Sequence, residues 1–389
     1  MTYWSEIVGQ RDAVQALEHA ARPGGERELA HAWLITGPPG SGRSNLALRF
    51  AAALIARDPS DREMVFGQVR ARTHPDVAVL TTQKVLIGID DVRDIVSTAH
   101  FAPAEGRHRV IVIEDADRMP ERTSNVLLKA LEEPPERTIW VLCAPSEADL
   151  LPTIPSRTRS LRLITPDAAE IAALLHERDG ADPVIAERAA RLAQSHIGMA
   201  RRLATEPEAL ARRDRTVTLA LSVTTLSDAM RAAAELLKVA KDDADALTER
   251  LDERERANAM RDMGLAPGAT IPPQLRSQIR ALEEDQKRRA TRSLRDGIDR
   301  IFTDLLSLYR DVMLSALSAE LSLINAEHES RIAELAGRWG AERALDAVDS
   351  IEVARDRLAR GVTPGLVLEA LMASLAAQNA HHPTREATR

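Results

Sequence analysis

The chain has 389 residues, 44% of them hydrophobic and 29% charged, with a formal net charge of −7. This length and composition predict two or three domains with large buried cores. The negative charge argues against a protein whose whole surface binds nucleic acid, although a local basic stripe remains compatible with it. Aromatic residues make up only 3% of the chain, which argues against base stacking as its main activity.

Cysteine usage and the lack of long apolar runs indicate the compartment. The single cysteine, Cys143, cannot form an internal disulfide, which fits a reducing environment. No apolar run reaches the roughly 18 residues that a membrane span requires. The N-terminus MTYWSEIVGQ lacks the pattern of a signal peptide. The sequence therefore predicts a cytoplasmic protein with no membrane partner.

The first 165 residues alternate short apolar runs with longer helical patterns, which is typical of a parallel sheet with crossover helices. A helix is expected from Asn45 to Ala56, directly after a glycine-rich loop. The expected strands are residues 32–37, 77–80, 109–114 and 139–143, with 161–164 as a further candidate. These patterns predict an α/β domain over residues 1–165.

Strand patterns end at Pro166, and the rest of the chain is predicted to be helical. Residues 166–206 are expected to form a small helical domain with a break at 196–198, and residues 207–389 a second, larger all-α domain. The charge-dense stretch 241–273 is interpreted as an insertion made of a solvated helix and a loop, and the last dozen residues as a disordered tail. Two apolar faces support the larger domain: Ile298, Ile301, Leu305, Leu308 and Val312, and Leu368, Leu371, Met372 and Leu375.

The loop GPPGSGRS matches the phosphate-binding pattern G-x-x-x-x-G-K-[ST] except at Arg43, which stands where the lysine belongs. In this motif, backbone N–H groups freed by glycines point at a phosphate from a helix N-terminus. Gly37, Gly40 and Gly42 supply that shape, and Ser44 supplies a hydroxyl for Mg²⁺. Arginine keeps the charge of lysine but is longer and planar. Phosphate binding is therefore expected to survive here, whereas well-placed transfer of the γ-phosphate is not.

A second acidic motif follows the apolar strand RVIVI. An aspartate that holds Mg²⁺ ordinarily precedes a glutamate that activates water, but here Glu114 comes first and Asp115 second, so the candidate base is one methylene shorter. A misplacement of about 1 Å can lower a rate about a hundredfold. The alternative is that both acids are simply solvated residues at a strand end. Together with Arg43, the reversed order indicates a P-loop fold that has lost hydrolysis.

Five motifs, in order along the chain, resemble those of a known family. They are IVGQ at 7–10, HAWLITGPPGSGRS at 31–44, SNVLLKALEEPP at 124–135, LLPTIPSRT at 150–158 and GMARRL at 198–203. With these motifs the chain resembles AAA+ clamp-loader subunits, and most closely the delta-prime family of bacterial DNA polymerase III. The resemblance covers residues 1–205, and the helical remainder matches the family only in type, as a collar domain.

The resemblance implies roles for individual residues. Val8 would lie against the adenine, and Arg201 would be the second sensor of a lid domain. The implied nucleotide-binding residues are Val8, Gly37, Pro38, Gly40, Ser41, Gly42, Arg43, Ser44, Glu114, Asp115 and Arg201. Arg157 would be a catalytic arginine that acts in trans, in a neighbouring subunit's ATP site, where such a residue can be worth about 10³–10⁵ in rate. The alternative for Arg157 is a local ion pair with an acid.

Three departures from the family pattern matter. Arg43 and the acid order are typical of a non-hydrolysing subunit. The segment Ala144-Pro145-Ser146 lacks the threonine pair that motor subunits carry as a first sensor. Residues 63–72 contain no cysteine where the family often has a four-cysteine zinc module, so no metal site is expected. His74 is accordingly interpreted as a capping or packing histidine.

Three hypotheses about function remain open from the sequence. The leading one is a delta-prime-like stator without intrinsic ATPase activity, in a complex that uses ATP and Mg²⁺ while this chain's own pocket is degenerate. Its implied partners are gamma/tau-type motor subunits, the delta subunit, the beta sliding clamp and, through the complex, primer-template DNA. One alternative is an active AAA+ ATPase in which Arg43 functions. The other is an independent DNA-binding protein, based on the basic residues Lys287, Arg288, Arg289 and Arg292.

Overall fold

The computed structural model describes residues 3–22, 29–82, 86–262 and 276–380. The chain divides into two compact units, Met1–Thr205 and Glu206–Arg389. Residues 263–273 and 381–389, which the sequence analysis assigned to a loop and a disordered tail, lie outside the described residues. Among the described residues, no helix is both long enough and apolar enough to cross a membrane.

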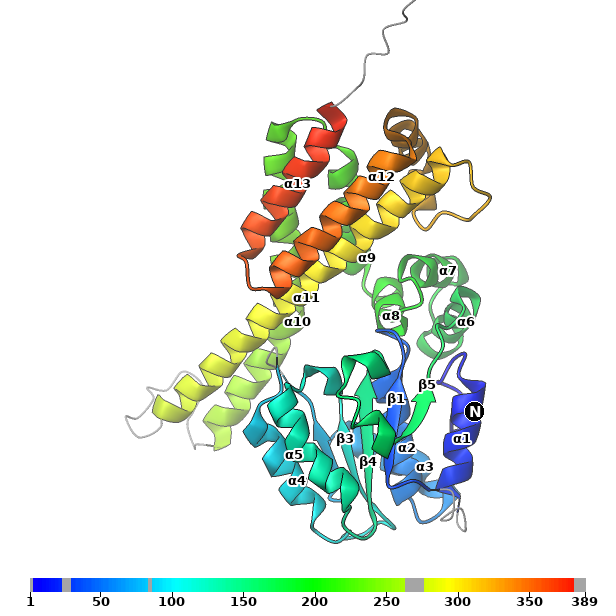
Figure 1. Ribbon diagram of the computed structural model, residues 1–389, viewed down its shortest axis with the longest axis vertical. Helices are drawn as coiled ribbons and strands as arrows, with labels where there is room; N and C mark the ends of the chain where they lie inside the picture. The colour runs from blue at the N-terminus through cyan, green and yellow to red at the C-terminus, as the bar shows by residue number, and fades with distance from the viewer. Residues whose placement is uncertain (1–2, 23–28, 83–85, 263–275, 381–389) are drawn as a thin grey trace, which may run out of the picture. The chain divides into compact units, whose positions relative to one another are not determined.

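The first unit is built on a five-stranded parallel sheet (Figure 1). The strands are β1 (Ala32–Thr36), β2 (Val77–Leu80), β3 (Arg109–Ile113), β4 (Thr138–Ala144) and β5 (Arg159–Arg162). They lie in the order β2-β3-β4-β1-β5, and every neighbouring pair is parallel. β1 therefore has a strand on each side, and the loop that follows it leaves the carboxyl edge near the middle of the sheet. The predicted α/β class with a parallel P-loop sheet is confirmed.

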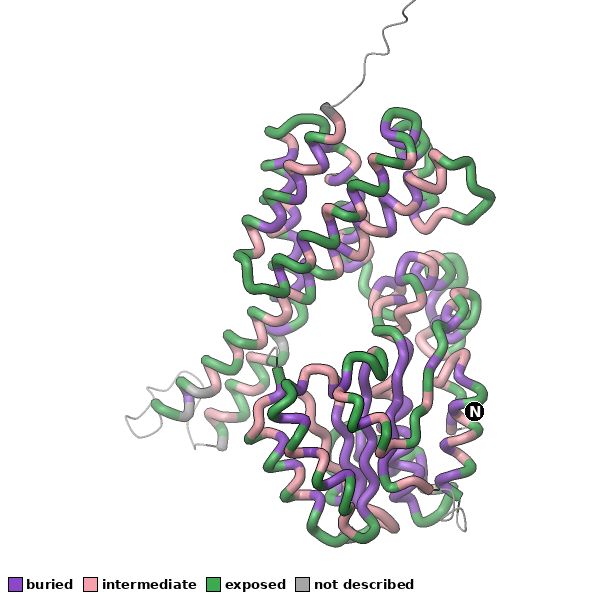
Figure 2. The backbone as a smooth tube through the Cα atoms, viewed as in Figure 1, coloured by how far each residue is buried: buried purple, intermediate pink, exposed green. Residues whose placement is uncertain are grey.

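Helices cover both faces of this sheet. One face packs against α1 (Arg11–Ala21), α2 (Arg43–Ile55) and α3 (Arg62–Arg70), and the other against α4 (Ile89–Ala99) and α5 (Glu121–Glu132). Successive strand residues point to opposite faces, so the central strands need apolar side chains at nearly every position. The buried strands of Figure 2 follow this rule, since Trp33 and Ile35 lie in one core and Leu34 in the other.

The start of the helix after the glycine loop and the position of the fifth strand differ from the predictions. The helix after the glycine loop begins at Arg43 rather than Asn45, so Arg43 and Ser44 belong to its first turn. The fifth strand covers Arg159–Arg162 rather than residues 161–164. This strand is at the edge of the sheet and is mostly exposed. The apolar run therefore marked the end of β5 and not its centre.

The first unit ends in a small helical domain, here called the lid. Its helices are α6 (Ala168–Asp179), α7 (Pro183–Leu192) and α8 (Ile197–Thr205). The Asp167 side chain accepts the N–H of Ala169, and Asp182 accepts two N–H groups at the start of α7, which fixes both helix starts. The break between α7 and α8 covers residues 193–196, slightly earlier than predicted, and Gln194 and Ser195 have positive φ values there.

The segment Thr73-His74-Pro75-Asp76 before β2 organises a distant loop. His74 is buried, and its Nδ1 accepts the N–H of Asp76. The fully buried Asp76 carboxylate accepts three N–H groups, from Ala104, Glu105 and Gly106, and lies 3.6 Å from Arg109. Burial alone would raise the pKa of Asp76, but the three N–H groups and Arg109 together lower it below its ordinary value.

We expect Asp76→Asn to lower the free energy of unfolding by about 2–3 kcal/mol at pH 7, because buried N–H groups and Arg109 lose a charged acceptor. Because the folded-state pKa is depressed, this stabilisation is present above the unfolded pKa and is lost as pH falls through the folded pKa. The difference between the two proteins should therefore shrink in acid. Urea unfolding at pH 7 and below pH 4 measures this difference.

Asp94→Asn, at an exposed position on α4, is the matched control and should change the free energy of unfolding little. Equal stability of wild type and Asp76→Asn at pH 7 would contradict this account of the loop.

The second unit is entirely helical among the described residues of Glu206–Arg389. Its helices are α9 (Pro207–Leu221), α10 (Leu226–Asp262), α11 (Arg276–Ala316), α12 (Glu329–Ala359) and α13 (Pro364–Ala380). Both predicted apolar faces, on α11 and α13, lie in one buried core. A kink at Gly340, where φ is 67°, interrupts α12. The expected all-α character of the C-terminal part is thereby confirmed.

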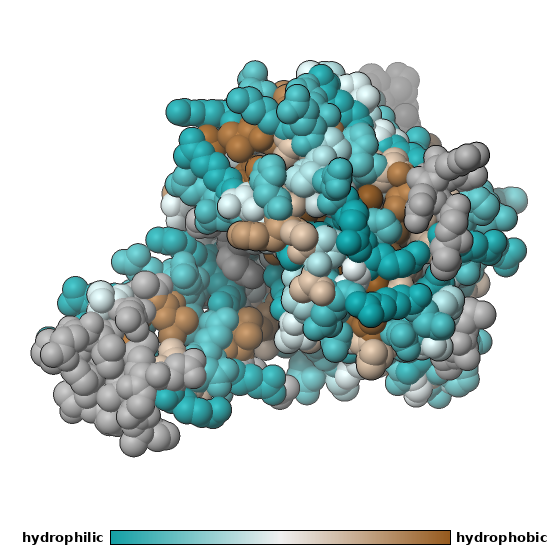
Figure 3. Space-filling model, turned by 90° about the horizontal axis from the view of Figure 1, so that it is seen from below, coloured by the Kyte–Doolittle hydropathy of each residue, from teal (hydrophilic) through white to brown (hydrophobic). Residues whose placement is uncertain are grey.

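The distal parts of α10 and α11 extend beyond this core. Residues 241–262 continue α10 as a largely exposed helix, as predicted. Ion pairs join the two helices here: Arg289 contacts Asp252 and Glu255, and Arg256 contacts Glu283. In Figure 3 this part of the surface is mostly hydrophilic, interrupted by a few apolar side chains.

The basic residues behind the DNA-binding hypothesis lie on this distal part of α11. Arg288 contacts Glu284 and Asp285, Arg289 contacts two acids on α10, and Arg292 contacts Asp296. Each of these three arginines thus has a carboxylate of the same chain beside it. Such pairing reduces the positive field that phosphate binding requires, so this cluster gives the DNA-binding hypothesis no structural support.

Candidate functional site

The glycine loop joins β1 to α2 and ends at the N-terminus of that helix. Gly40 and Gly42 have φ values of 81° and 91°, in the left-handed region that favours glycine. A Cβ on Gly37 would lie 2.8 Å from the Cβ of Leu163 and 2.9 Å from Ser41 Oγ, so only glycine fits there. The loop therefore keeps the backbone shape that a phosphate requires at a helix N-terminus.

Arg43 uses its side chain on the loop itself. Its Nη1 donates a hydrogen bond of 2.5 Å to the carbonyl oxygen of Gly37. The charge is thus kept beside the loop, but it is directed at a backbone oxygen of the same chain. Ser41 Oγ is buried and has no hydrogen-bond partner among the described residues. Pro38 lies within the same loop and Ser44 in the first turn of α2.

Glu114 and Asp115 follow β3 and influence each other's charge. Burial raises the pKa of Glu114; the positive charge of Arg72 lowers this pKa, and the negative charge of Asp115 raises it further. Asp115 has a φ of 53°, and its Oδ2 lies 3.7 Å from Arg118 Nε. Burial at Glu114 therefore disfavours the charged carboxylate, which is the form that binds Mg²⁺.

Asp117 joins this group, although the sequence analysis did not select it. Burial is the main cause of its raised pKa, the charge of Asp115 raises it further, and Arg118 and Arg43 oppose the rise. Its Oδ1 has no hydrogen-bond partner among the described residues. The only sequence signal was its place two residues after Asp115 in EDAD.

Cys143, on β4, lies close to the charged groups Glu114, Asp115 and Arg43. It is fully buried, which raises the pKa of its thiol to about 12, and Glu114 raises it further while Arg43 opposes. Burial therefore disfavours the thiolate, which is the form of cysteine that acts as a nucleophile or metal ligand. Among the described residues, no group of three or more His, Cys, Asp or Glu side chains is arranged to hold a metal ion.

The lid contacts the P-loop through the residues that precede the predicted second sensor. The Ile197 N–H donates to the Gly40 carbonyl oxygen at 3.1 Å. The His196 ring packs so closely on Gly40 that a Cβ there would lie 2.2 Å from His196 Cγ. Its Nδ1 accepts the N–H of Met199. Sequence reasoning missed both residues, although they stand directly before the GMARRL motif.

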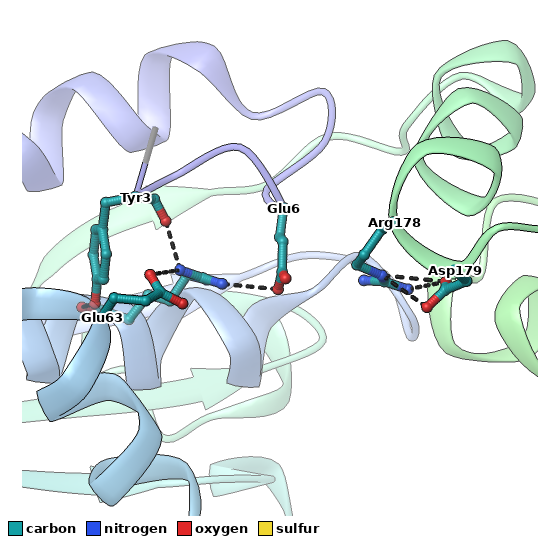
Figure 4. Close-up of polar contacts among 6 residues, drawn as sticks. Tyr3, Glu6, Glu63, Arg178 and Asp179 are labelled. Atoms are coloured by element: carbon teal, nitrogen blue, oxygen red, sulfur yellow. Dashed lines mark hydrogen bonds and ion pairs between the residues drawn. The ribbon is translucent and has the colours of Figure 1, made fainter. Parts of the chain in front are cut away.

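Arg201, the predicted second sensor, lies against an acid of the lid. Its Nε is 3.0 Å from Asp179 Oδ1. Asp179 is also bound by Arg178, whose Nε and Nη2 both donate to the carboxylate (Figure 4). The structure therefore brings Arg201 to Asp179, and a role for Arg201 at a phosphate stays a prediction.

The N-terminal segment that contains Val8 is fixed at two points. Arg49, on α2, donates to the Tyr3 carbonyl and to Glu6, both labelled in Figure 4. Its guanidinium also lies over the Phe66 ring at 4.1 Å. Gln10 exchanges two hydrogen bonds with the backbone of Ile164, just before the lid. Val8 itself is half-buried between these anchors. Its predicted contact with adenine is compatible with this position but stays a prediction.

Arg157 lies at the opposite end of the sheet from the P-loop. It belongs to a short 3-10 helix, Pro155–Arg157, which precedes the N-terminal end of β5. Arg159, the first residue of β5, pairs with Trp33 of β1. The phosphate loop begins at Gly37, four residues after Trp33, so roughly 13 Å of strand separates Arg159 from the start of the loop. Arg157 therefore lies at the edge of the sheet that does not carry this chain's own phosphate loop.

The Arg157 side chain has contacts within its own chain. Its Nη2 lies 2.6 Å from Glu132 Oε1, and its Nη1 donates to the Thr153 carbonyl and to Ser156 Oγ. The local ion pair that the sequence analysis held as the alternative is therefore present. About a third of the Arg157 side chain stays exposed, and its action in trans stays a prediction.

Comparisons with known proteins show what the first part of the chain resembles. Residues 9–167 match the family model described as DNA polymerase III, delta subunit. Over 154 residues the chain is 36% identical to DNA polymerase III subunit delta' of Pseudomonas aeruginosa, covering 38% of this chain and 47% of that protein. Residues 9–167 thus resemble clamp-loader subunits of DNA polymerase III, and a delta' subunit is among their relatives.

Other relatives include gamma/tau subunits. DNA polymerase III subunit gamma/tau of Mycobacterium tuberculosis is 31% identical over 172 residues, covering 42% of this chain and 29% of that protein. The chain thus spans less than half the length of these curated relatives. A solved DNA polymerase III, gamma subunit-related protein from Thermotoga maritima aligns with 95% of this chain and 100% of its own, at 17% identity and a TM-score of 0.49.

The pocket geometry leads to a prediction about turnover. We expect the purified chain to hydrolyse no ATP above background, because Arg43 is bonded to Gly37 and the acid order is reversed. Arg43→Lys alone should not restore activity, since Glu114 and Asp115 remain unchanged. Steady-state phosphate release measures this. Turnover near the typical ~10 s⁻¹ of enzymes, abolished by Arg43→Ala, would contradict the prediction.

Proposed function

We propose that this chain is a delta-prime-like, non-hydrolysing subunit of a DNA polymerase III clamp loader and that it donates Arg157 to a neighbouring subunit's ATP site. The match of residues 9–167 to the DNA polymerase III delta subunit family model and the 36% identity to a delta' subunit support the general assignment. The observation that carries the finer one is the location of Arg157 at the sheet edge opposite its own P-loop. An arginine in that position can serve a phosphate only across an interface.

The state of the chain's own pocket supports the same proposal. The backbone cradle is kept, but Arg43 is bonded to Gly37, and Glu114 carries a raised pKa. A subunit of this kind would act as a stator, which holds its neighbours while they hydrolyse ATP. Its partners would be gamma/tau-type motor subunits, the delta subunit, the sliding clamp and primer-template DNA reached through the assembled ring.

The ATP of the neighbouring site would be the substrate on which Arg157 acts. Arginine presents a planar fork of N–H donors that matches phosphate oxygens in two directions at once. It would stabilise the charge that develops on the transferring phosphoryl group. No base or nucleophile from this chain would be required, which agrees with the altered acids after β3.

Replacement of Arg157 tests the proposal in the reconstituted complex. We expect Arg157→Ala to lower DNA- and clamp-stimulated ATPase activity partially, because other sites in the ring would keep their own trans arginines. Arg157→Lys should rescue poorly, since a point charge cannot reproduce the guanidinium fork. Assembly, measured by native mass spectrometry, should be unchanged. If the Arg157→Ala complex equals wild type in ATPase activity and clamp loading, this chain is not an arginine donor.

The second unit leads to a separate prediction about assembly. We propose that residues 207–389 form the collar through which the chain enters the ring, because this unit has its own large core and exposed apolar side chains such as Leu345 and Val353 on α12. A chain truncated after Thr205, where the first compact unit ends, should stay soluble but fail to co-purify with the other subunits. Co-purification of the truncated chain at wild-type yield would show that the collar assignment is wrong.

A further inference from the structure

We propose that Glu132 restrains the trans arginine by competing with phosphate for its guanidinium, an inference that rests on the function proposed above. Glu132 is the last residue of α5. Its Oε1 lies 2.6 Å from Arg157 Nη2, although the two residues are 25 positions apart in the sequence. Both stand at the sheet edge that carries the N-terminal ends of β4 and β5, because α5 leads into β4.

The position of Glu132 indicates that the pair has a role beyond helix stability. A carboxylate in the last turn of a helix lies at the negative end of the macrodipole, which is unfavourable by itself. The pair is also accessible: 48% of the Glu132 side chain and 34% of the Arg157 side chain are exposed. An approaching subunit therefore reaches both partners without any local unfolding.

The contacts of the guanidinium divide into charged and neutral ones. Nη2 meets the Glu132 carboxylate, whereas Nη1 donates to the Thr153 carbonyl at 2.9 Å and to Ser156 Oγ at 3.3 Å. The neutral acceptors hold the side chain in place without compensating its charge. The carboxylate compensates the charge and so weakens the attraction to any other anion. Exchange of Glu132 for a phosphate would leave the neutral contacts intact.

The strengths of the two charged partners favour this exchange. A terminal phosphate carries more negative charge than a carboxylate and offers three acceptor oxygens to the arginine fork. The pair with Glu132 is solvent-exposed, and such pairs are weak. In the free chain Glu132 therefore holds Arg157, and in the ring a neighbour's nucleotide displaces it. Glu132 thereby lowers the contribution of Arg157 until phosphate is in position.

The test uses the full chain in the reconstituted clamp loader, with ATPase activity measured in the absence of DNA and clamp. We expect Glu132→Gln to raise kcat about two- to five-fold, the range that the strength of an exposed ion pair implies, with KM for ATP unchanged. Glu133→Gln is the matched control, because it removes the same charge from the adjacent, exposed residue. It should leave kcat at the wild-type value.

A double variant shows whether Glu132 acts through the arginine. In the Arg157→Ala background, Glu132→Gln should have no effect, so the double variant should equal Arg157→Ala alone. An unchanged or lower kcat for Glu132→Gln would overturn the inference, as would an increase that persists without Arg157. If Arg157→Ala itself equals wild type, the proposed function fails instead. A loss of assembly by Glu132→Gln, seen by native mass spectrometry, would also overturn the inference and mark Glu132 as structural.

Discussion

The parallel direction of the five strands determines what this chain can do with a phosphate. All carboxyl ends meet at one edge of the sheet, so the loop after β1 and the acids after β3 gather there. The Pro155–Arg157 segment precedes β5 and is therefore at the other edge. No change of side-chain rotamer can bring Arg157 to its own P-loop. Under the proposed function, this chain would have two separate surfaces for nucleotide: its own phosphate loop, and Arg157, which only a neighbour's nucleotide could reach.

Several groups around the chain's own phosphate loop have partners within the same chain. Arg43 is hydrogen-bonded to Gly37, Arg201 forms an ion pair with Asp179, and the Ile197 N–H at the start of α8 donates to Gly40. Each of these groups has a partner inside the chain. Burial raises the pKa values of Glu114 and Asp117, because it disfavours their charged forms. Under the proposed function, such a unit would keep the fold without the requirement for turnover.

Much of the fold could be predicted because the central strands are buried on both faces. Such strands appear in the sequence as continuous apolar runs, so β1 to β4 were predicted close to their observed bounds. β5 was misplaced because an edge strand carries exposed polar residues such as Arg159 and Arg162. The phosphate loop was predictable because its spacing is local in the sequence.

Other features depend on contacts between distant residues, and no local pattern encodes them. Asp179 lies 22 positions before Arg201, and Glu132 lies 25 before Arg157. His196 was overlooked because its partner, Gly40, is on another domain of the same unit. In each case the sequence identified one member of a pair by its motif. The second member is visible only once the fold has brought the two together.

A photoreactive ATP that carries its cross-linker on the γ-phosphate tests the central claim most directly. The analogue is bound to the assembled complex, irradiated, and the labelled peptides of this chain are mapped by mass spectrometry. The account predicts labelling within residues 153–159, at the edge that carries Arg157, and no labelling of that segment when this chain is irradiated alone. Labelling of residues 37–44 without any around Arg157 would contradict it, because the γ-phosphate would then lie in this chain's own pocket.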